Sequence, residues 1–168
     1  MTISAGAFKP ATFQFRSSTA VEVAAGAFGA TQVKAWSVYF RATLAEAYYR
    51  AGDIQSGLST LGEALELSDQ LGERFWQAGM LYFKGVMLMS LSAEDEAESC
   101  YRAALQIAHQ REAKSLELRA AMSLARLWRD QGRRSSARDL LVPVHGWFTE
   151  GLETADWREA SALLDELK

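Results

Sequence analysis

Only one cysteine and two prolines occur among the 168 residues of the chain. The lone Cys100 cannot close an internal disulfide, and it excludes a zinc site built on cysteine pairs. The sequence is 49% hydrophobic and 23% charged. Together with the low proline content, this balance is typical of a folded domain rather than a disordered tail. A chain of this length buries about 68–70% of its unfolded surface, enough for one core or one continuous stack.

Long apolar runs are absent as well. No stretch of the sequence approaches the roughly eighteen consecutive apolar residues that a membrane span requires. No apolar run long enough for a signal peptide follows Lys9. The net charge of −3 gives no overall attraction for nucleic acid. We therefore expect a soluble protein of the reducing cytoplasm, with no membrane among its partners.

What the sequence does contain is an internal repeat. Small residues recur at Gly57, Ala97 and Ala137, with a spacing of 40 residues. Small residues at corresponding positions let two helices approach closely, and larger apolar residues one turn away fill the contact. The same register aligns Gly52, Ser92 and Gly132; Leu61, Tyr101 and Leu141; Ala64, Ala104 and Val144; Leu44, Lys84 and Leu124; and Ala45, Gly85 and Ala125.

Within each repeat the apolar residues follow a helical period. Trp36, Phe40, Leu44 and Tyr48 fall every four residues, which is the spacing of one helix face. We therefore predict an all-α fold of three helix hairpins, in units of about 33–72, 73–112 and 113–148. The first helices are expected near 33–51, 73–91 and 114–131, and the second helices near 54–70, 94–110 and 134–146.

Residues typical of turns lie between the predicted helices. Gly52 can take the left-handed conformation that ends a helix, and Asp53 can accept hydrogen bonds from the amides that begin the next one. Ser92, followed by Asp95, is predicted to cap the second helix of the middle unit. Pro143 falls within the last second helix, where it should cause a kink or an early end.

The two ends of the chain differ in pattern. Residues 1–30 show no sustained period, and a short helix near 19–28 is the one element that they suggest. After Gly151 the sequence predicts a capping helix at about 154–167, which would cover the open end of the stack. The N-terminal end has no such cap, so assembly into a homo-oligomer stays open. The apolar stripe of the capping helix consists of Ala160, Leu163, Leu164 and Leu167.

The aligned positions resemble the consensus of tetratricopeptide (TPR) repeats, which implies a TPR-like right-handed stack. The chain departs from that consensus at Gly57, where alanine is preferred, and at Lys84, which replaces an apolar residue. Its period also exceeds the usual one of about 34 residues, which implies longer helices. The matching positions are Leu44, Ala45, Tyr48, Gly52, Asp53, Gly57, Leu61 and Ala64 in the first unit, and Leu124, Ala125, Trp128, Gly132, Ala137 and Val144 in the third.

Residues 31–168 also resemble the closing repeats of large bacterial signalling proteins, in which a TPR tail follows a nucleotide-cyclase or DNA-binding head and a predicted ATPase. The resemblance implies a bacterial regulatory setting. The sequence lacks a Gly-x-x-x-x-Gly-Lys-Ser/Thr phosphate loop and has no room for a cyclase, so that ATPase and cyclase activity are not carried over. The similar segments are 44–48, 72–76, 113–133, 146–151 and 163–167.

The resemblance to TPR repeats also implies a concave groove, because four positions of each first helix face it in that fold. The predicted groove is aromatic at one end and rich in arginine at the other. Tyrosine and arginine are side chains in which binding energy concentrates, so we expect a peptide or protein partner that carries acidic groups. The groove positions are Tyr39, Ala42, Glu46 and Tyr49; Gly79, Tyr82, Val86 and Met89; and Arg119, Met122, Arg126 and Arg129.

Two other interpretations of these residues stay open. In the first, the tyrosines pack between repeats and the arginines form a solvated face paired with Glu112, Glu117 and Asp130. In the second, the basic residues of the third unit bind nucleic acid. The sequence disfavours nucleic acid, because no exposed aromatic ladder accompanies these residues. They are Arg111, Lys114, Arg119, Arg126, Arg129, Arg133, Arg134 and Arg138.

No pattern in the sequence points to catalysis, a cofactor or a metal. His109 and His145 lie in different units without the spacing of metal ligands, and Cys100 falls on an apolar stretch like a small core residue. We therefore predict a non-catalytic protein-interaction scaffold; the alternative is a ligand-sensing tail that regulates a separate ATPase or nucleotide cyclase. Core and junction positions are expected for the tryptophans, which are Trp36, Trp76, Trp128, Trp147 and Trp157.

Overall fold

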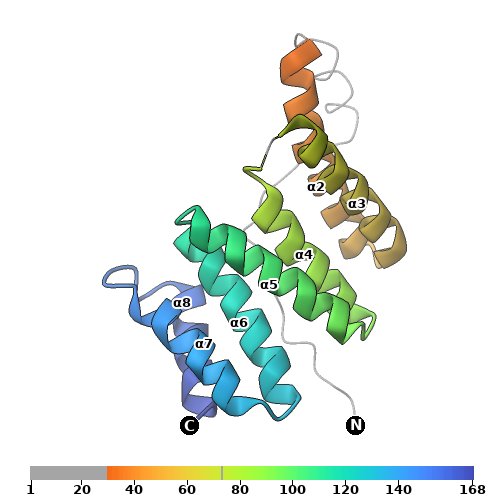
Figure 1. Ribbon diagram of the computed structural model, residues 1–168. Coiled ribbons are helices and arrows are strands. Elements are labelled where there is room, and N and C mark those ends of the chain that lie inside the picture. Colours follow the sequence, from red (N-terminus) through yellow and green to blue (C-terminus); the bar gives the residue numbers. More distant parts are fainter. Residues whose placement is uncertain (1–29, 73) are drawn as a thin grey trace.

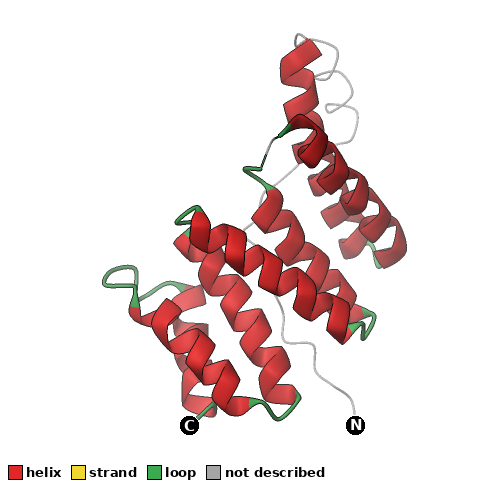
Figure 2. Ribbon diagram, in the orientation of Figure 1, coloured by secondary structure: helices red, strands yellow, loops and turns green. Residues whose placement is uncertain are grey.

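The computed structural model describes residues 30–72 and 74–168. Within these residues the chain forms seven helices and no strand (Figure 2). Residues 1–29, including the short helix expected near 19–28, lie outside the described part. None of the described helices is long and apolar enough to cross a membrane. The helices are α2 (Ala30–Arg50), α3 (Ile54–Leu71), α4 (Gln77–Ser90), α5 (Glu94–Gln110), α6 (Lys114–Asp130), α7 (Arg134–Gly146) and α8 (Ala155–Glu166).

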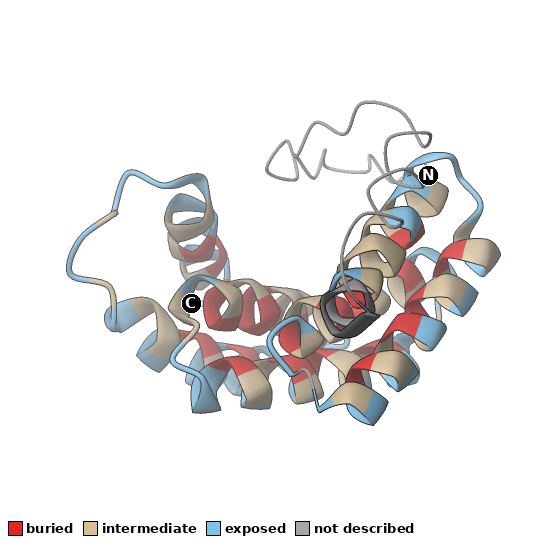
Figure 3. Cartoon of the chain, turned by 90° about the horizontal axis from the view of Figure 1, so that it is seen from above, coloured by how far each residue is buried: buried red, intermediate tan, exposed pale blue. Residues whose placement is uncertain are grey.

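The helices pair into three hairpins, α2 with α3, α4 with α5 and α6 with α7, and α8 follows the last hairpin (Figure 1). Seen from above, the stack curves into an arc (Figure 3). The first helices of the hairpins lie along the inner side of this arc, and the second helices lie along the outer side. The predicted all-α stack of hairpins with a C-terminal helix is confirmed.

The helix boundaries agree with the predictions except at the start of α4. The helices α5 and α7 have the expected bounds, whereas α4 begins at Gln77 rather than at residue 73. Gly72 ends α3 with a φ of 68°, and Trp76 is the N-cap of α4 without a side-chain hydrogen bond. Because Phe75 and Trp76 are apolar, they extend the helical period of the sequence through this turn.

The turns within the hairpins use a left-handed residue at the aligned position. Gly52 and Gly132 have φ angles of 84° and 78°, and Ser92 has a φ of 59° at the corresponding place. Asp53 caps α3 as predicted, since its Oδ1 accepts a hydrogen bond from the Ser56 amide at 3.1 Å. The capping role predicted for Ser92 is wrong, because Ala93 is the N-cap of α5.

Pro143 does not end the last second helix early. The helix α7 continues through Pro143 to Gly146, although at 13 residues it is shorter than α3 and α5. Proline cannot donate a hydrogen bond to the carbonyl one turn back, which belongs to Asp139. Asp139 is exposed, so that water can hydrate this carbonyl.

The two helices of each hairpin meet at small residues. Ala97 and Ala137 are fully buried, and a Cβ added to Gly57 would lie 3.2 Å from the carbonyl oxygen of Ala45 on the partner helix. In the middle unit a Cβ on Gly85 would lie 2.5 Å from Cε1 of Tyr101. The other two units carry leucine where the middle unit has tyrosine, and alanine where it has glycine. The Tyr101 ring, which is larger than leucine, therefore requires glycine instead of alanine at position 85.

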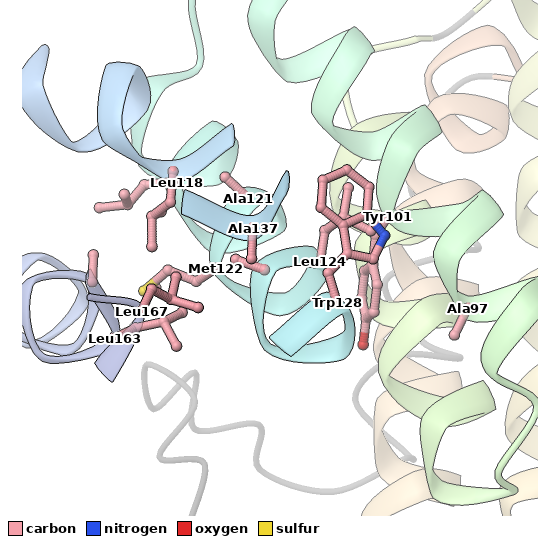
Figure 4. Close-up of a cluster of buried hydrophobic side chains, with 13 residues drawn as sticks. Ala97, Tyr101, Leu118, Ala121, Met122, Leu124, Trp128, Ala137, Leu163 and Leu167 are labelled. Atoms are coloured by element: carbon pink, nitrogen blue, oxygen red, sulfur yellow. The ribbon is translucent and has the colours of Figure 1, made fainter. Parts of the chain in front are cut away.

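The buried residues form two clusters. The first belongs to the first unit and α4, and it includes Val38, Leu61 and Met87. The second joins α5, α6, α7 and α8 (Figure 4). The interface between α3 and α4 is smaller than the one between α5 and α6. The first unit is thus attached to the stack less extensively than the third. The second cluster consists of Ala97, Tyr101, Leu118, Ala121, Met122, Leu124, Ala125, Trp128, Ala137, Leu141, Ala160, Leu163 and Leu167.

Replacement of Gly85 by alanine is expected to destabilise the fold. The added methyl group would overlap the buried Tyr101 ring, and overpacking of this kind costs about 1–3 kcal/mol. Urea unfolding of Gly85→Ala measures the change. Gly62→Ala is the matched control, because a Cβ there meets no atom within 4 Å and alanine is favoured in a helix by roughly 0.5–1 kcal/mol. Equal stability of the two variants would contradict the packing described here.

Candidate functional site

The structure brings four of the predicted groove residues to one pocket between α2 and α4. Tyr39, Ala42 and Glu46 of α2 face Gly79 of α4 across a pocket of about 180 Å³. We call it the inner pocket. The expected juxtaposition of these positions is therefore present in the first two units. The remaining lining residues are Thr43, Leu61, Trp76, Met80 and Phe83.

Aromatic side chains surround the inner pocket. The Tyr39 and Trp76 ring centroids are 5.2 Å apart, and the Trp36 and Phe75 rings extend the contact on either side. Trp36, Phe75 and Trp76 are 53%, 67% and 41% exposed. Exposed aromatic groups that touch one another are frequent in protein interfaces, because each ring offers a large apolar surface. We call Trp36, Tyr39, Phe40, Phe75 and Trp76 the aromatic cluster.

The exposure of the aromatic cluster corrects one expectation from the sequence. Trp36, Trp76 and Trp147 were predicted to be core or junction residues, yet all three are exposed. Helical periodicity placed Trp36 on an apolar face, but the sequence could not show that no other described helix packs on that face of α2. Only Trp128 is buried among the five tryptophans.

The remaining aromatic groove residues are partly buried between the units. The Tyr49 hydroxyl lies 3.3 Å from Ser90 Oγ, and the Tyr49 ring meets Phe83 edge-on at 5.4 Å. Tyr82 and Met89 pack against the second core cluster, and burial raises the pKa of the Tyr82 hydroxyl. These side chains contribute to packing between repeats, as the first open interpretation proposed.

The arginine-rich end of the predicted groove is covered by α8. Met122 is 3% exposed and lies beside Leu163 and Leu167 (Figure 4), so that its side chain does not line an open groove. The three arginines around it each form an ion pair with an acid of α8. The pairs join Arg119 Nε to Asp156 Oδ2 at 2.6 Å, Arg126 Nη2 to Glu159 Oε2 at 3.0 Å, and Arg129 to Glu166.

These ion pairs align α8 on α6 but contribute little to the stability of the fold. Their side chains remain partly exposed to solvent, and exposed pairs contribute about 0–1 kcal/mol each. Burial of Leu163 and Leu167 contributes more, at about 1.5–3 kcal/mol for each fully buried side chain. The apolar stripe therefore holds α8 in place, and the ion pairs fix its register on α6.

The basic residues of the third unit do not form one free patch. Arg133 pairs with Glu98 at 3.1 Å, and its guanidinium lies 4.5 Å from the Trp128 ring centroid. Arg129 pairs with Asp130, as one open interpretation expected, as well as with α8. Glu117 pairs with Lys114 rather than with an arginine. Most of the positive charge is thus opposed by nearby carboxylates.

A cavity lined by residues of the second and third units was not expected from the sequence. It has a volume of about 800 Å³ and lies on the outer side between α5 and α7, with α6 below. We call it the outer groove. Its residues come from three separate helices, and no single stretch of sequence signals it. The apolar lining includes Leu105, Trp128, Leu140, Val144 and Trp147, and the polar lining includes Arg102, His109, Lys114 and Glu117.

A buried carboxylate lies at one end of the outer groove. Glu117 is only 5% exposed, and it lies 2.8 Å from both Lys114 Nζ and His109 Nδ1. Burial alone would raise the pKa of the Glu117 carboxyl, but the hydrogen bonds from Lys114 and His109 hold this pKa below its usual value. Glu117 therefore stays ionised and anchors the first turn of α6.

The described residues offer no group with an evident catalytic or metal-binding arrangement. No three His, Cys, Asp or Glu side chains between residues 30 and 72 or between 74 and 168 are placed to hold a metal ion. His145 stacks on Trp157 at 4.6 Å and lies 2.8 Å from Ser161 Oγ. Burial raises the pKa of the half-buried Cys100 thiol, which disfavours the nucleophilic thiolate.

Solved structures of TPR-like repeat proteins share this fold. A candidate kinesin light chain from Podosopora anserina, with nearly identical TPR-like repeats, matches with a TM-score of 0.66 at 16% sequence identity, over 89% of this chain and 72% of that chain. A point variant of the same protein gives a TM-score of 0.67 at 17% identity. BtubC (BKLC) from P. vanneervenii gives 0.63 at 16% identity, over 77% of this chain and 61% of that chain.

No protein-family model matches the sequence, and no curated protein matches it either. At 16–17% identity the structural likeness establishes a TPR-like repeat fold.

Replacement of Glu117 by glutamine is expected to lower stability in a pH-dependent way. At pH 7 the variant should lose about 1–3 kcal/mol, because the buried carboxylate that accepts charged hydrogen bonds from Lys114 and His109 is removed. The contribution of Glu117 is present above its unfolded pKa of about 4.3 and is lost as the pH falls through its lower folded pKa. Urea unfolding of the wild type and of Glu117→Gln between pH 3 and pH 7 measures the difference.

The stability difference should therefore shrink below about pH 4. Glu112→Gln, which alters an exposed acid in the adjoining turn, controls for the loss of one negative charge. A difference that stays constant from pH 3 to pH 7 would rule out an ionised Glu117 as its origin.

Proposed function

We propose that the chain is a non-catalytic interaction module that binds another polypeptide on the inner side of its first two units. The observation that carries this proposal is the exposed aromatic cluster around the inner pocket. Aromatic residues that border a pocket are typical anchors of protein interfaces. TPR-like folds present such surfaces for protein partners, and the same use is proposed for this chain.

The inner pocket indicates what the partner offers. Its volume of about 180 Å³ is smaller than the roughly 300–1,000 Å³ of small-molecule sites, and it suits a single apolar side chain of a polypeptide. Glu46 lies at its edge and pairs with Arg50 at 2.6 Å. We infer that an apolar side chain of the partner enters the pocket while flanking polar groups of the partner meet Glu46 and Arg50.

The wider setting is part of the same proposal. The resemblance of residues 31–168 to the TPR tails of bacterial signalling proteins supports a bacterial, cytoplasmic and regulatory role. Tyr49 contacts Phe83 of the inner pocket, and Tyr82 and Met89 pack against the second core cluster, which includes α6 residues. The acids expected of the partner would then meet the arginine-rich end of the predicted groove, which α8 covers in this structure.

A second candidate function is ligand sensing for a separate ATPase or cyclase. One observation favours it, because the outer groove of about 800 Å³ falls within the volume range of small-molecule sites. The two functions use opposite sides of the arc. They are therefore distinguished by variants that alter one side at a time.

A bulky residue at position 79 is expected to abolish partner binding. Gly79 lines the inner pocket, and a Cβ there meets no atom within 4 Å, so that the side chain of Gly79→Leu fills the pocket and also favours the helix. Affinity capture from a lysate of the native source, quantified by mass spectrometry, should show a partner retained by the wild type and reduced at least about tenfold by Gly79→Leu.

Gly62→Leu on α3 is the matched control, since it introduces the same side chain at another glycine with open space. Circular dichroism melting verifies that both variants fold. Retention of every partner by Gly79→Leu at the wild-type level would contradict binding at the inner pocket.

A further inference from the structure

The inner face of α6 already holds a helix in this structure. Arg119 and Arg129 are ten residues apart on α6, and their partners Asp156 and Glu166 are ten residues apart on α8. The two helices therefore run in the same direction, with their charges in register. We call Arg119, Met122, Arg126 and Arg129 the arginine face.

The helix α8 is not placed like the first helix of a further repeat. The interface between α8 and α6 is larger than the interface between α6 and α4, which are successive first helices. The interface between α8 and α7 is smaller than the interface between α6 and α5, the second helix before it. A stacked first helix would repeat the earlier pattern and rest mainly on the preceding second helix. Instead, α8 leans toward the inner side of the arc and covers the arginine face.

The contact between α8 and the arginine face combines apolar and charged groups. Ala160 and Leu163 of α8 and the C-cap residue Leu167 are buried, and Leu163 and Leu167 lie beside Met122 (Figure 4). The acids of α8 flank this stripe and reach the three arginines. An amphipathic helix laid on a complementary surface is a recurrent mode of peptide recognition. The helix α8 therefore shows what the arginine face binds, namely an apolar stripe flanked by carboxylates.

The link to α8 is longer than the other connections of the stack. Residues 147–154 join α7 to α8, whereas residues 51–53, 91–93 and 131–133 suffice within the hairpins. The ion pairs that align α8 remain partly exposed. Departure of α8 would expose Met122 and its neighbours in the second core cluster, whereas the contacts between the two helices of each hairpin do not involve α8.

We propose that the arginine face is a binding site for an acidic amphipathic helix of a partner protein, and that α8 is its resident intramolecular competitor. The proposal rests on the proposed function, a polypeptide-binding role for the inner side of the arc. The partner helix carries an apolar stripe flanked by carboxylates that match the spacing of Arg119, Arg126 and Arg129. Charge complementarity and the occupant α8 itself define this partner.

A synthetic peptide of residues 152–168 tests the recognition directly. The labelled peptide should bind the full chain, and a matched peptide with Asp156→Asn, Glu159→Gln and Glu166→Gln should bind about tenfold more weakly, because three ion pairs are lost. Fluorescence anisotropy measures both affinities. Equal affinities of the two peptides would overturn the proposal, since the arginines would then contribute nothing to recognition.

A variant of the full chain tests the competition. The same three substitutions in α8 of the chain should increase the affinity for the unmodified peptide about tenfold, because the resident helix competes less well. Asp165→Asn is the matched control, since Asp165 belongs to α8 but pairs with Lys168. It should leave peptide affinity unchanged. No gain in affinity for the triple variant, or an equal gain for Asp165→Asn, would overturn the proposal.

Hydrogen exchange shows whether the peptide takes the place of α8. With saturating peptide, residues 155–166 of the chain should lose protection while α6 keeps it. Peptide binding with α8 still protected would overturn the proposal, and so would reciprocal exchange of α8 between two copies, seen as a dimer by light scattering. Gly79→Leu should bind the peptide normally, so that failure of the inner pocket and failure of the arginine face give different results.

Discussion

The close approach of two helices at small side chains is the constraint on which the rest of this structure depends. Gly57 packs against the backbone of Ala45, and Gly85 accommodates the Tyr101 ring. Side chains one methyl group larger at these points would separate the helices of a hairpin, and with them the apolar residues one turn away. Because the spacing recurs every 40 residues, three similar hairpins follow one another, and the stack curves into an arc with distinct inner and outer sides.

This curvature decides what the surfaces can do. The inner side presents one face of each first helix, and the two ends of that side are used differently. At the N-terminal end, aromatic side chains remain exposed around the inner pocket. At the C-terminal end, α8 covers the arginine face through Leu163, Leu167 and three ion pairs. The inner side of the arc therefore has two halves. One is open and apolar, and the other is charged and covered by α8 of the same chain.

The hairpins were predictable from the sequence because they depend on local patterns. The 40-residue register and the four-residue apolar period specified the helices, and Gly52 with Asp53 specified a turn. The start of α4 was not predictable, because Phe75 and Trp76 continue an apolar pattern through a turn. Lys84 occupies a position where the other two units have leucine, and the middle unit nevertheless stacks between them.

The site was predictable only in part, since it depends on contacts between distant residues. The resemblance to TPR repeats implied that Tyr39, Glu46 and the arginines lie on one side of the stack. It did not reveal that acids more than thirty positions away reach those arginines, because the apolar stripe of residues 154–167 predicts only a cap on the open end of the stack. The exposure of Trp36 likewise depends on what packs beside α2, which periodicity does not encode.

Site-specific photo-crosslinking in cells that produce the chain tests the central claim most directly. A photoreactive amino acid in place of Phe75, an exposed ring of the aromatic cluster that does not line the inner pocket, is compared with the same amino acid at the exposed Ser59 on the outer helix α3. The account predicts a crosslink to a second polypeptide from position 75 and none from position 59. Crosslinks from position 59 alone would contradict it and would place the partner on the outer side of the arc.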